Sequence, residues 1–334
     1  MTHGAGPPGG EGRRLRVGLV GTGLIAQVMH LHYLTELADR FEIAALADLD
    51  AGSARACAGQ YRVPLVFTDW REMLGHPLDA VMVLTSGSHA PIAVAAARAG
   101  LHVFVEKPMC FSVAEGREMV AAAEQAGVTL MVGYPKRYDP AFTRFQKEAA
   151  QLAGARLMRV TTFESPIAAY VEHYPLLPRE PLPADVLQRF RDDNDARVRG
   201  AIGEASPLER AVYETVLLDT LVHELNAIRG VLGEPDRLDY VSLHQDTVTV
   251  MFRFGALPVA LHWIDLPGIS RYEMELALVR AGPPAAAGVP VPVPPQRARG
   301  AGDRGRRPGL GAVLAHRGGR LLRERLQAGA RRIP

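Results

Sequence analysis

An aspartate and a histidine four residues apart, Asp219 and His223, form the pair in this sequence best suited to moving a proton. Residues at i and i+4 share one helix face, and a carboxylate beside an imidazole orients it and favours its charged form. Lys107 is a third candidate, because its ammonium can bond a substrate oxygen and stabilise developing negative charge. Such groups suit the oxidation of an alcohol, which needs a base for the hydroxyl proton and a hydride acceptor. Taken singly, each would more commonly be a solvated surface group.

The turn that would hold a hydride acceptor is GTGLIA, residues 21–26, at the end of an apolar run. In the pattern G-x-G-x-x-A, glycines permit a tight turn and close approach of a pyrophosphate at a helix N-terminus. Asp48 ends the second predicted strand, where an acid bonds the ribose 2′-hydroxyl and repels a 2′-phosphate. The sequence therefore predicts NAD over NADP, although nearby Arg55 would soften that preference. The predicted cofactor-binding residues here are Gly21, Gly23, Leu24, Ile25, Ala26 and Asp48.

The elements that must position these residues follow two patterns along the chain. From Leu15 to Pro135, short apolar strands alternate with helices, which predicts a parallel sheet covered on both faces. After Arg137 a helix, a strand and a polar, proline-bearing region precede a long helix at 208–232, and four consecutive strands follow. Consecutive strands joined by short turns predict antiparallel pairing. The predicted fold class is an α/β Rossmann dinucleotide-binding domain plus an α+β domain with an open, mainly antiparallel sheet.

Several motifs stand in the order found in the Gfo/Idh/MocA oxidoreductases, which include glucose–fructose oxidoreductase and inositol dehydrogenase. Residues 15–279 resemble this family. Its E-K-P signature matches Glu106-Lys107-Pro108, and its D-x-x-x-H helix matches LLDTLVHELNAIRGVLGEP. Its aromatic–Arg–aromatic–Asp-Pro segment matches VGYPKRYDP, and a histidine stands upstream of E-K-P at His89. The resemblance implies catalytic roles for Lys107, Asp219 and His223, and cofactor contacts from Thr85, His89, Glu106, Lys107 and Arg137.

The activity implied by the resemblance is hydride transfer between NAD(H) and a secondary hydroxyl or ketone of a sugar, cyclitol or related polyol. A homo-oligomer formed through the open sheet is implied as well. The sequence departs from the family at Ser86-Gly87, where Pro-Asn is common, and at Asn226, where Asp is common. Both departures bear on cofactor or substrate detail. The alternative is a non-catalytic dinucleotide-binding regulator or an inactive remnant of the same fold.

Other candidate groups carry less chemistry. His30 and His32 are two residues apart, so on a helix they diverge and form a poor metal pair. Asp192–Asp195 lacks the spacing and glycine of a calcium loop and is interpreted as a solvated turn. Cys57 and Cys110 are expected to be free thiols of a reducing compartment, with Cys110 a packing residue rather than a nucleophile. No metal is expected, and the absence of a long apolar run favours a cytoplasmic protein without membrane contact.

The predicted domain limits are a flexible leader at 1–14, an NAD-binding domain at 15–137, a substrate and oligomerisation domain at 138–280, and a tail at 281–334. Eleven arginines and two acids give the tail +9, which leaves −7 for the rest of a chain whose total is +2. A basic tail on an acidic body is typical of nucleic-acid binding, and this is one interpretation. A genuine disordered Pro/Ala/Arg-rich tail is another.

A third interpretation, and our hypothesis, is a shift of reading frame between Leu276 and Pro283. Residues 275–332 contain no Ser, Thr, Lys, Asn, Phe, Tyr, Trp, Met, Cys or Ile, although disordered arms are usually rich in Ser and Lys. Every residue type present can be encoded by a codon starting with G or C, as in a GC-rich gene read out of frame. Reading 289–297 one base later permits FPSPYLRN, a strand and turn. The second domain would then be incomplete, with an exposed sheet edge, and the tail would indicate no nucleic-acid partner.

Overall fold

The computed structural model describes residues 13–268 and 272–280. Contacts among them divide the chain into two compact units. The first contains residues 13–133 and 175–204, and the second contains 134–174 with the described residues from 205 to 280. Residues 1–12 of the predicted leader and the whole tail at 281–334, with its three interpretations, lie outside the described residues.

A six-stranded parallel sheet forms the centre of the first unit, with the order β3-β2-β1-β4-β5-β6. Its strands are short apolar runs, as expected where both faces are covered. This order is that of the doubly wound dinucleotide-binding sheet, in which ligands bind where the winding reverses, here between β1 and β4. The predicted Rossmann domain is confirmed. The strands are β1 (Leu15–Val20), β2 (Phe41–Ala47), β3 (Leu65–Phe67), β4 (Ala80–Val83), β5 (His102–Val105) and β6 (Leu130–Val132).

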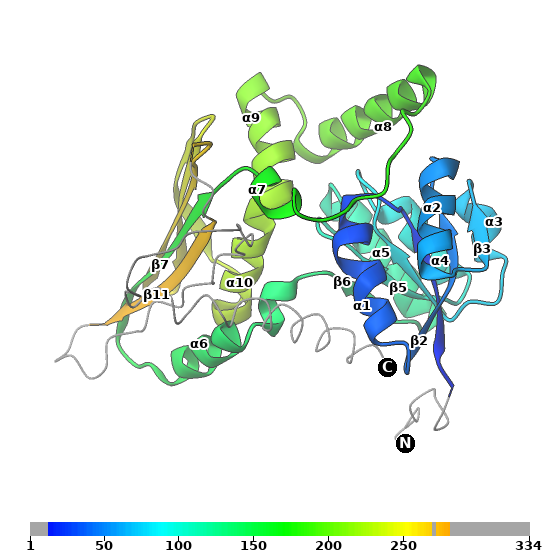
Figure 1. Ribbon diagram of the computed structural model, residues 1–334. Coiled ribbons are helices and arrows are strands. Elements are labelled where there is room, and N and C mark those ends of the chain that lie inside the picture. The colour runs from blue at the N-terminus through cyan, green and yellow to red at the C-terminus, as the bar shows by residue number, and fades with distance from the viewer. Residues whose placement is uncertain (1–12, 269–271, 281–334) are drawn as a thin grey trace, which may run out of the picture. The chain divides into compact units, whose positions relative to one another are not determined.

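Helices cover both faces of this sheet (Figure 1). One face packs on α3, α4 and α5, and the other on the η1–α1 helix and α2. Local sequence starts two of them: Asp50 caps α2 by accepting from the amide of Ser53, and Ser112 with Glu115 forms a capping box at α5. The helices are η1 (Ala26–His30), α1 (Leu31–Glu36), α2 (Ala51–Tyr61), α3 (Trp70–Leu74), α4 (Ala90–Arg98) and α5 (Val113–Ala126).

The first unit also contains α8 (Ala184–Ile202), which the sequence interpretation missed. Asp192–Asp195 is not a solvated turn, because all four residues lie inside this helix. Only Val198 of α8 is buried, so no apolar stripe marks the helix in the sequence. Its support comes instead from pairs at i, i+4, such as Arg189 with Asp185 and Arg197 with Asp193.

A five-stranded sheet with the order β11-β7-β10-β9-β8 forms the second unit. All neighbouring pairs are antiparallel except β10 with β7, so the predicted open, mainly antiparallel sheet is confirmed. The four strands predicted at the end of the domain are all present. The strands are β7 (Ala155–Glu164), β8 (Arg237–Leu243), β9 (Thr247–Phe254), β10 (Leu257–Asp265) and β11 (Glu273–Arg280).

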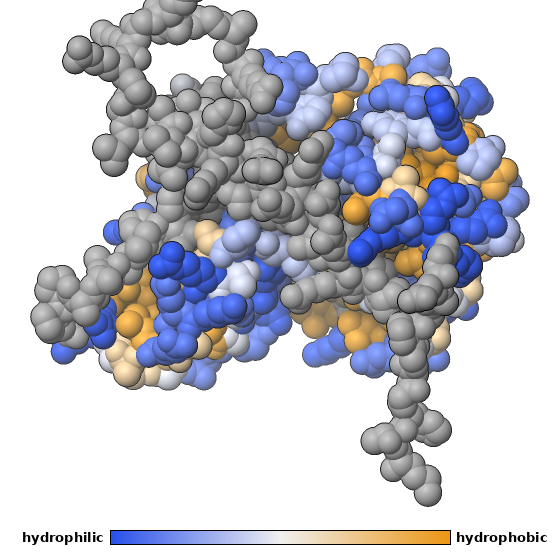
Figure 2. Space-filling view, turned by 60° about the horizontal axis from the view of Figure 1, so that its bottom comes forward, coloured by the Kyte–Doolittle hydropathy of each residue, from blue (hydrophilic) through white to orange (hydrophobic). Residues whose placement is uncertain are grey.

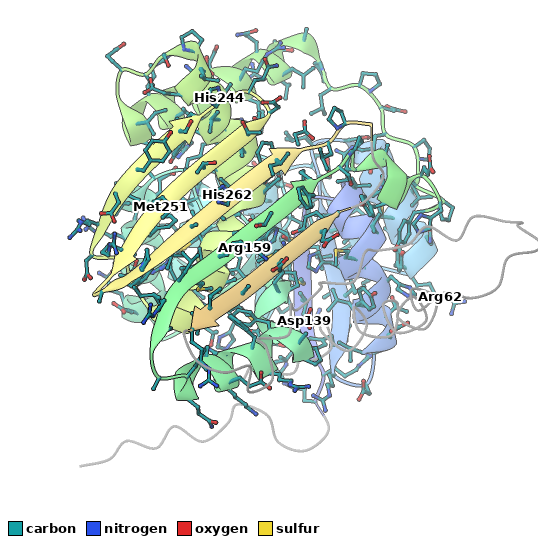
Figure 3. All side chains as sticks on the ribbon, turned by 90° about the vertical axis from the view of Figure 1, so that its left-hand side faces the viewer. Arg62, Asp139, Arg159, His244, Met251 and His262 are labelled. Carbon is teal, nitrogen blue, oxygen red and sulfur yellow. The ribbon has the colours of Figure 1, made fainter. Side chains whose placement is uncertain are left out.

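The two faces of this sheet differ in polarity. Met158, Val160 and Leu261 are fully buried and belong to the core that the sheet shares with the unit's helices. Their neighbours in sequence point the other way, and Figure 3 shows Arg159 and His262 on the opposite face, with Met251 beside them. The alternation follows from the two-residue period of a strand.

The helices of the second unit lie before β7, after it and before β8. The predicted helix at 208–232 is present as three consecutive pieces, the middle one a π-helical stretch that contains Asp219. The helices are η2 (Pro135–Tyr138), α6 (Pro140–Gln151), α7 (Ala168–Val171), α9 (Pro207–Ala211), η3 (Val212–Leu221) and α10 (Val222–Leu232).

The described surface mixes polar and apolar residues, as the space-filling view shows for one face of the molecule (Figure 2). No helix in the described part of the chain has both the length and the apolar character that a membrane span requires.

Candidate functional site

The turn after β1 is so tight that only glycine fits at its first position. Gly21 has a φ of +100°, and a Cβ there would lie 2.9 Å from the backbone carbon of Leu84. Such a contact cannot be relieved by a side-chain movement, and the positive φ disfavours every other residue. Gly23 has a different role, because a Cβ on it would meet no backbone atom within 4 Å among the described residues beyond its two chain neighbours. No other part of the backbone therefore crowds Gly23, while Gly21 brings β1 close to β4.

Asp48, at the carboxyl end of β2, is bonded to this turn. Its Oδ2 accepts hydrogen bonds from the amide of Thr22 at 2.7 Å and from the Thr22 hydroxyl at 2.9 Å. Thr22 is fully buried and also contacts the Ser53 hydroxyl at 3.0 Å. The sequence motif predicts neither the bonds of Thr22 to Asp48 nor its contact with Ser53, because the motif allows any residue between the two glycines.

These residues fit a dinucleotide. A bare glycine backbone, a helix that starts behind it and a carboxylate on the neighbouring parallel strand are the groups that a pyrophosphate and a ribose require. A second carboxylate, Asp50, lies two residues beyond Asp48, and its pKa is lowered: burial opposes the shift, but the amides of Ser53 and Glu180 outweigh it. Two carboxylates therefore lie at the predicted ribose site.

His89 and Thr85, both predicted to bind cofactor, lie in the loop after β4 and are joined to each other. The His89 ring is 1% exposed, with Nε2 2.8 Å from the carbonyl of Thr85 and Nδ1 2.7 Å from the carbonyl of Pro108. This geometry ties the loop after β4 to the loop after β5. His89 thus joins the loops that follow two neighbouring strands of the sheet.

Glu106 and Lys107 follow β5 directly, at the same edge of the sheet as Gly21 and Asp48. Glu106 Oε1 lies 2.7 Å from His30 Nε2, and Oε2 accepts the amide of Lys107 at 3.0 Å. Burial alone would raise the pKa of Glu106, but the bond and charge of His30 outweigh it and lower the pKa. The sequence assigned no partner to His30, which is 6% exposed, while His32 points to Glu36 as expected for diverging residues.

In the second unit, Asp219 is exposed and His223, one turn later, is partly buried. The ring of His223 lies edge-on to Tyr134, with 6.3 Å between centroids. Arg137, in η2, is bonded to the helix that carries His223: its Nε donates to Oδ1 of Asn226 in α10 at 2.6 Å. Where the family commonly has an aspartate, this chain thus has the neutral acceptor Asn226 beside Arg137. Burial and the nearby Arg229 lower the pKa of Arg137.

Next to His223 lies a buried polar cluster that the sequence did not indicate. Glu224 is 1% exposed and accepts from the Thr162 hydroxyl at 3.0 Å, with Lys136 Nζ at 3.4 Å from the same oxygen. The Tyr272 hydroxyl bonds Lys136 and lies 3.4 Å from Glu224. Burial, followed by Glu224, raises the pKa of Tyr272 well above its usual value. This cluster fixes the helix that carries His223 to β7 and β11.

Both free cysteines have thiol pKa values above the usual value. Burial raises the pKa of Cys57 to about 11, and Cys110, affected by burial and then by Glu115, is also raised to about 11. Within the described residues, no group of three or more His, Cys, Asp or Glu side chains could hold a metal ion.

Comparison with known proteins agrees with the first unit's architecture. Residues 15–134 match the family described as "Oxidoreductase family, NAD-binding Rossmann fold", GFO_IDH_MocA. With the strand order and the glycine–aspartate site, this match shows an NAD-binding Rossmann domain of the oxidoreductase type. Residues 15–134 belong to the Gfo/Idh/MocA family.

Inositol 2-dehydrogenase of Salmonella paratyphi B is 31% identical over 111 residues, which cover 32% of this chain and 33% of that protein. The chain thus aligns with about a third of the length of such curated relatives. Among solved structures, GenD2 from gentamicin A biosynthesis in complex with NAD is 25% identical, with a TM-score of 0.61 over 83% of this chain and 74% of that one. The myo-inositol 2-dehydrogenase of Lactobacillus plantarum, 16% identical with a TM-score of 0.62 over 81% of this chain and 75% of that one, has the same fold.

Proposed function

We propose that this protein is an NAD(H)-dependent oxidoreductase that interconverts a secondary hydroxyl and a ketone on a sugar, cyclitol or related polyol. The observation that carries the proposal is the bond between the glycine turn and Asp48, on adjacent parallel strands of a family-type Rossmann sheet. The substrate class is supported by the similarity of residues in the first unit to inositol 2-dehydrogenase.

The dinucleotide would be held by the turn after β1 and the ends of β2 and β4. When bound, it would supply the hydride acceptor. Asp48 would accept from the ribose hydroxyls, and the combined charge of Asp48 and Asp50 would repel a 2′-phosphate, which favours NAD over NADP. The residues proposed for this role are Gly21, Gly23, Leu24, Ile25, Ala26, Asp48 and Thr85.

Three side chains would serve the substrate. Lys107 would donate a hydrogen bond to the reacting oxygen and stabilise negative charge on it. His223 would take the hydroxyl proton, and Asp219, one turn earlier on the helix, would orient the imidazole and favour its charged form. His89, Glu106 and Arg137 act as positioning residues in this proposal, because their polar atoms are bonded to the chain itself.

The test is a panel of sugars, cyclitols and polyols with NAD, followed through NADH formation by the full chain. Lys107→Ala should lower kcat by at least about 100-fold while the Kd for NADH stays unchanged. Lys147→Ala, which removes an exposed lysine of α6, is the matched control and should behave as wild type. Undiminished turnover in Lys107→Ala would refute the assigned role, and NADH binding without turnover on any panel member would favour a non-catalytic regulator.

A further inference from the structure

Residues 177–197 of the first unit lie across the ends of the strands that would hold the dinucleotide. The amide of Leu177 donates to Gln27 Oε1 at 2.7 Å, and the amide of Glu180 donates to Asp50 Oδ2 at 2.9 Å. Gln27 in turn donates to the carbonyl of Thr22 at 2.9 Å. The segment is therefore anchored to the turns after β1 and β2. Figure 1 shows it in green, passing beside α1 and α2 before it enters α8.

Arg179 is the residue of this segment that reaches the proposed ribose carboxylate. One guanidinium nitrogen lies 3.1 Å from Oδ1 and 3.4 Å from Oδ2 of Asp48. Another lies 3.1 Å from the position that a Cβ on Gly23 would take, closer than any other described atom outside Gly23 and its chain neighbours. The guanidinium thus covers the open face of Gly23, where backbone must be accessible to a pyrophosphate.

The carboxylate of Asp48 has little capacity left for a ligand. Oδ2 accepts two bonds from Thr22, and Oδ1 accepts the amide of Asp50 at 2.9 Å as well as the bond from Arg179. Each carboxylate oxygen has about two lone-pair sites. A ribose hydroxyl can therefore bond Asp48 only where Arg179 withdraws.

The segment makes a second contact at the end of β4. A Cβ on Gly87 would lie 2.9 Å from Phe190 Cζ and 3.0 Å from Asn194 Oδ1. Further along α8, Arg197 pairs with Glu115 at the start of α5. The cover therefore extends from the β1 and β2 turns to the loop after β4, the three places that a dinucleotide would contact.

We propose that residues 177–197 form a built-in competitor for the dinucleotide, with Arg179 in the place of the ribose on Asp48, and that cofactor binding requires this segment to move away. The inference rests on the proposed dinucleotide site. Because only a fraction of molecules would have the site open, the apparent affinity is reduced by that fraction. Asp50 beside the ion pair argues against Arg179 as a receptor for a 2′-phosphate, since that phosphate would meet two carboxylates.

The first test measures NADH and NADPH binding to the full chain by fluorescence titration. Arg179→Ala should lower the Kd for NADH by about five-fold, in line with one partly exposed ion pair. The control is Arg189→Ala, which removes an exposed arginine whose ion pair, with Asp185, lies within α8, and which should leave the Kd unchanged. An unchanged or raised Kd for NADH in Arg179→Ala overturns the inference, as does a selective loss of NADPH binding. If neither wild type nor variant binds NADH, the proposed function itself fails.

The second test does not depend on a variant. Hydrogen exchange of the wild-type amides of Leu177, Arg179 and Glu180 is compared with and without saturating NADH. The amides of Leu177 and Glu180, now bonded to Gln27 and Asp50, should exchange faster when NADH binds. Slower exchange would mean that the segment closes over the ligand rather than competing with it, and would overturn the inference.

Discussion

Glu106 in the first unit and Glu164 in the second are both largely removed from water, yet their pKa values move in opposite directions. The pKa of Glu106 is lowered: burial opposes the shift, but the bond and charge of His30 outweigh it. The pKa of Glu164 is raised, chiefly by burial, because the amide of Ser165 and the charge of Lys136 do not compensate and Glu224 adds repulsion.

The difference lies in how many acids share a base. In the first unit Glu106 has His30 at 2.7 Å. In the second, Lys136 is 3.4 Å from Glu224 and also acts on Glu164, so one ammonium serves two carboxyl groups. A buried acid stays charged where a partner is dedicated to it, and it tends toward its neutral form where that partner is divided.

The largest expected effect comes from replacing Lys136, the cation that Glu224 and Glu164 share. Lys136→Met keeps a side chain of similar size but leaves Glu224 buried without its cation. We therefore expect a loss of about 3–5 kcal/mol in the free energy of unfolding. Urea denaturation followed by circular dichroism measures it. Lys147→Met, on the exposed side of α6, should change stability little. A loss below about 1 kcal/mol would show that Thr162 and Tyr272 satisfy Glu224 without the lysine.

A smaller effect is expected at the pair of His30 and Glu106. His30→Leu leaves Glu106 without its main donor and should cost about 2 kcal/mol, the value of a hydrogen bond to a charged group. The pKa of Glu106 is lowered in the folded state. Ionised Glu106 therefore stabilises the folded protein at pH values above the usual glutamate pKa, and this stabilisation is lost as the pH falls through the pKa of the folded state. Thermal unfolding should therefore lose part of its acid dependence in His30→Leu. His32→Leu, an exposed neighbour, should retain it, and equal curves for all three proteins would contradict the pairing.

The smallest effect concerns Glu164 and has the opposite sign. Because the folded pKa is raised, Glu164 favours the folded state at low pH, and this advantage is lost as pH rises through the folded pKa. Glu164→Gln removes the cost of a buried charge and should raise Tm by about 2 °C at neutral pH, with the gain disappearing in acid. Glu172→Gln, at an exposed position, is the control. A lower Tm at neutral pH would mean that the charged form of Glu164 is needed.

Much of the fold could be predicted from the sequence because it rests on local patterns. The strands of the first sheet are short apolar runs, and the four strands at 237–280 follow one another across short turns. The helix α8 could not be predicted in this way, because it buries only Val198. Its signal was charge spacing, as in Arg189 with Asp185, which stabilises a helix without an apolar face.

In the candidate site as well, residues set by local sequence could be predicted and partners distant in the sequence could not. Gly21 and Asp48 could be identified because a turn and a strand end impose them locally. The partners His30 for Glu106 and Lys136 for Glu224 are 76 and 88 residues apart in the chain, so no local pattern relates them. Arg179 lies 131 residues from Asp48, in a region whose composition indicated only a polar connection. Such pairings are set by topology, and only the folded chain reveals them.

The close packing of Arg137 on Gly230 limits which residues can occupy these two positions. A Cβ on Gly230 would lie 2.5 Å from the guanidinium carbon of Arg137, so the arginine rests against the helix only where residue 230 has no side chain. The two positions therefore constrain each other sterically although 93 residues separate them in the sequence. Chains that retain this arginine geometry should retain glycine at the matching helical position, and chains that gain a larger residue there should have lost or redirected the arginine. Residues 137 and 230 are thus expected to vary together across related sequences.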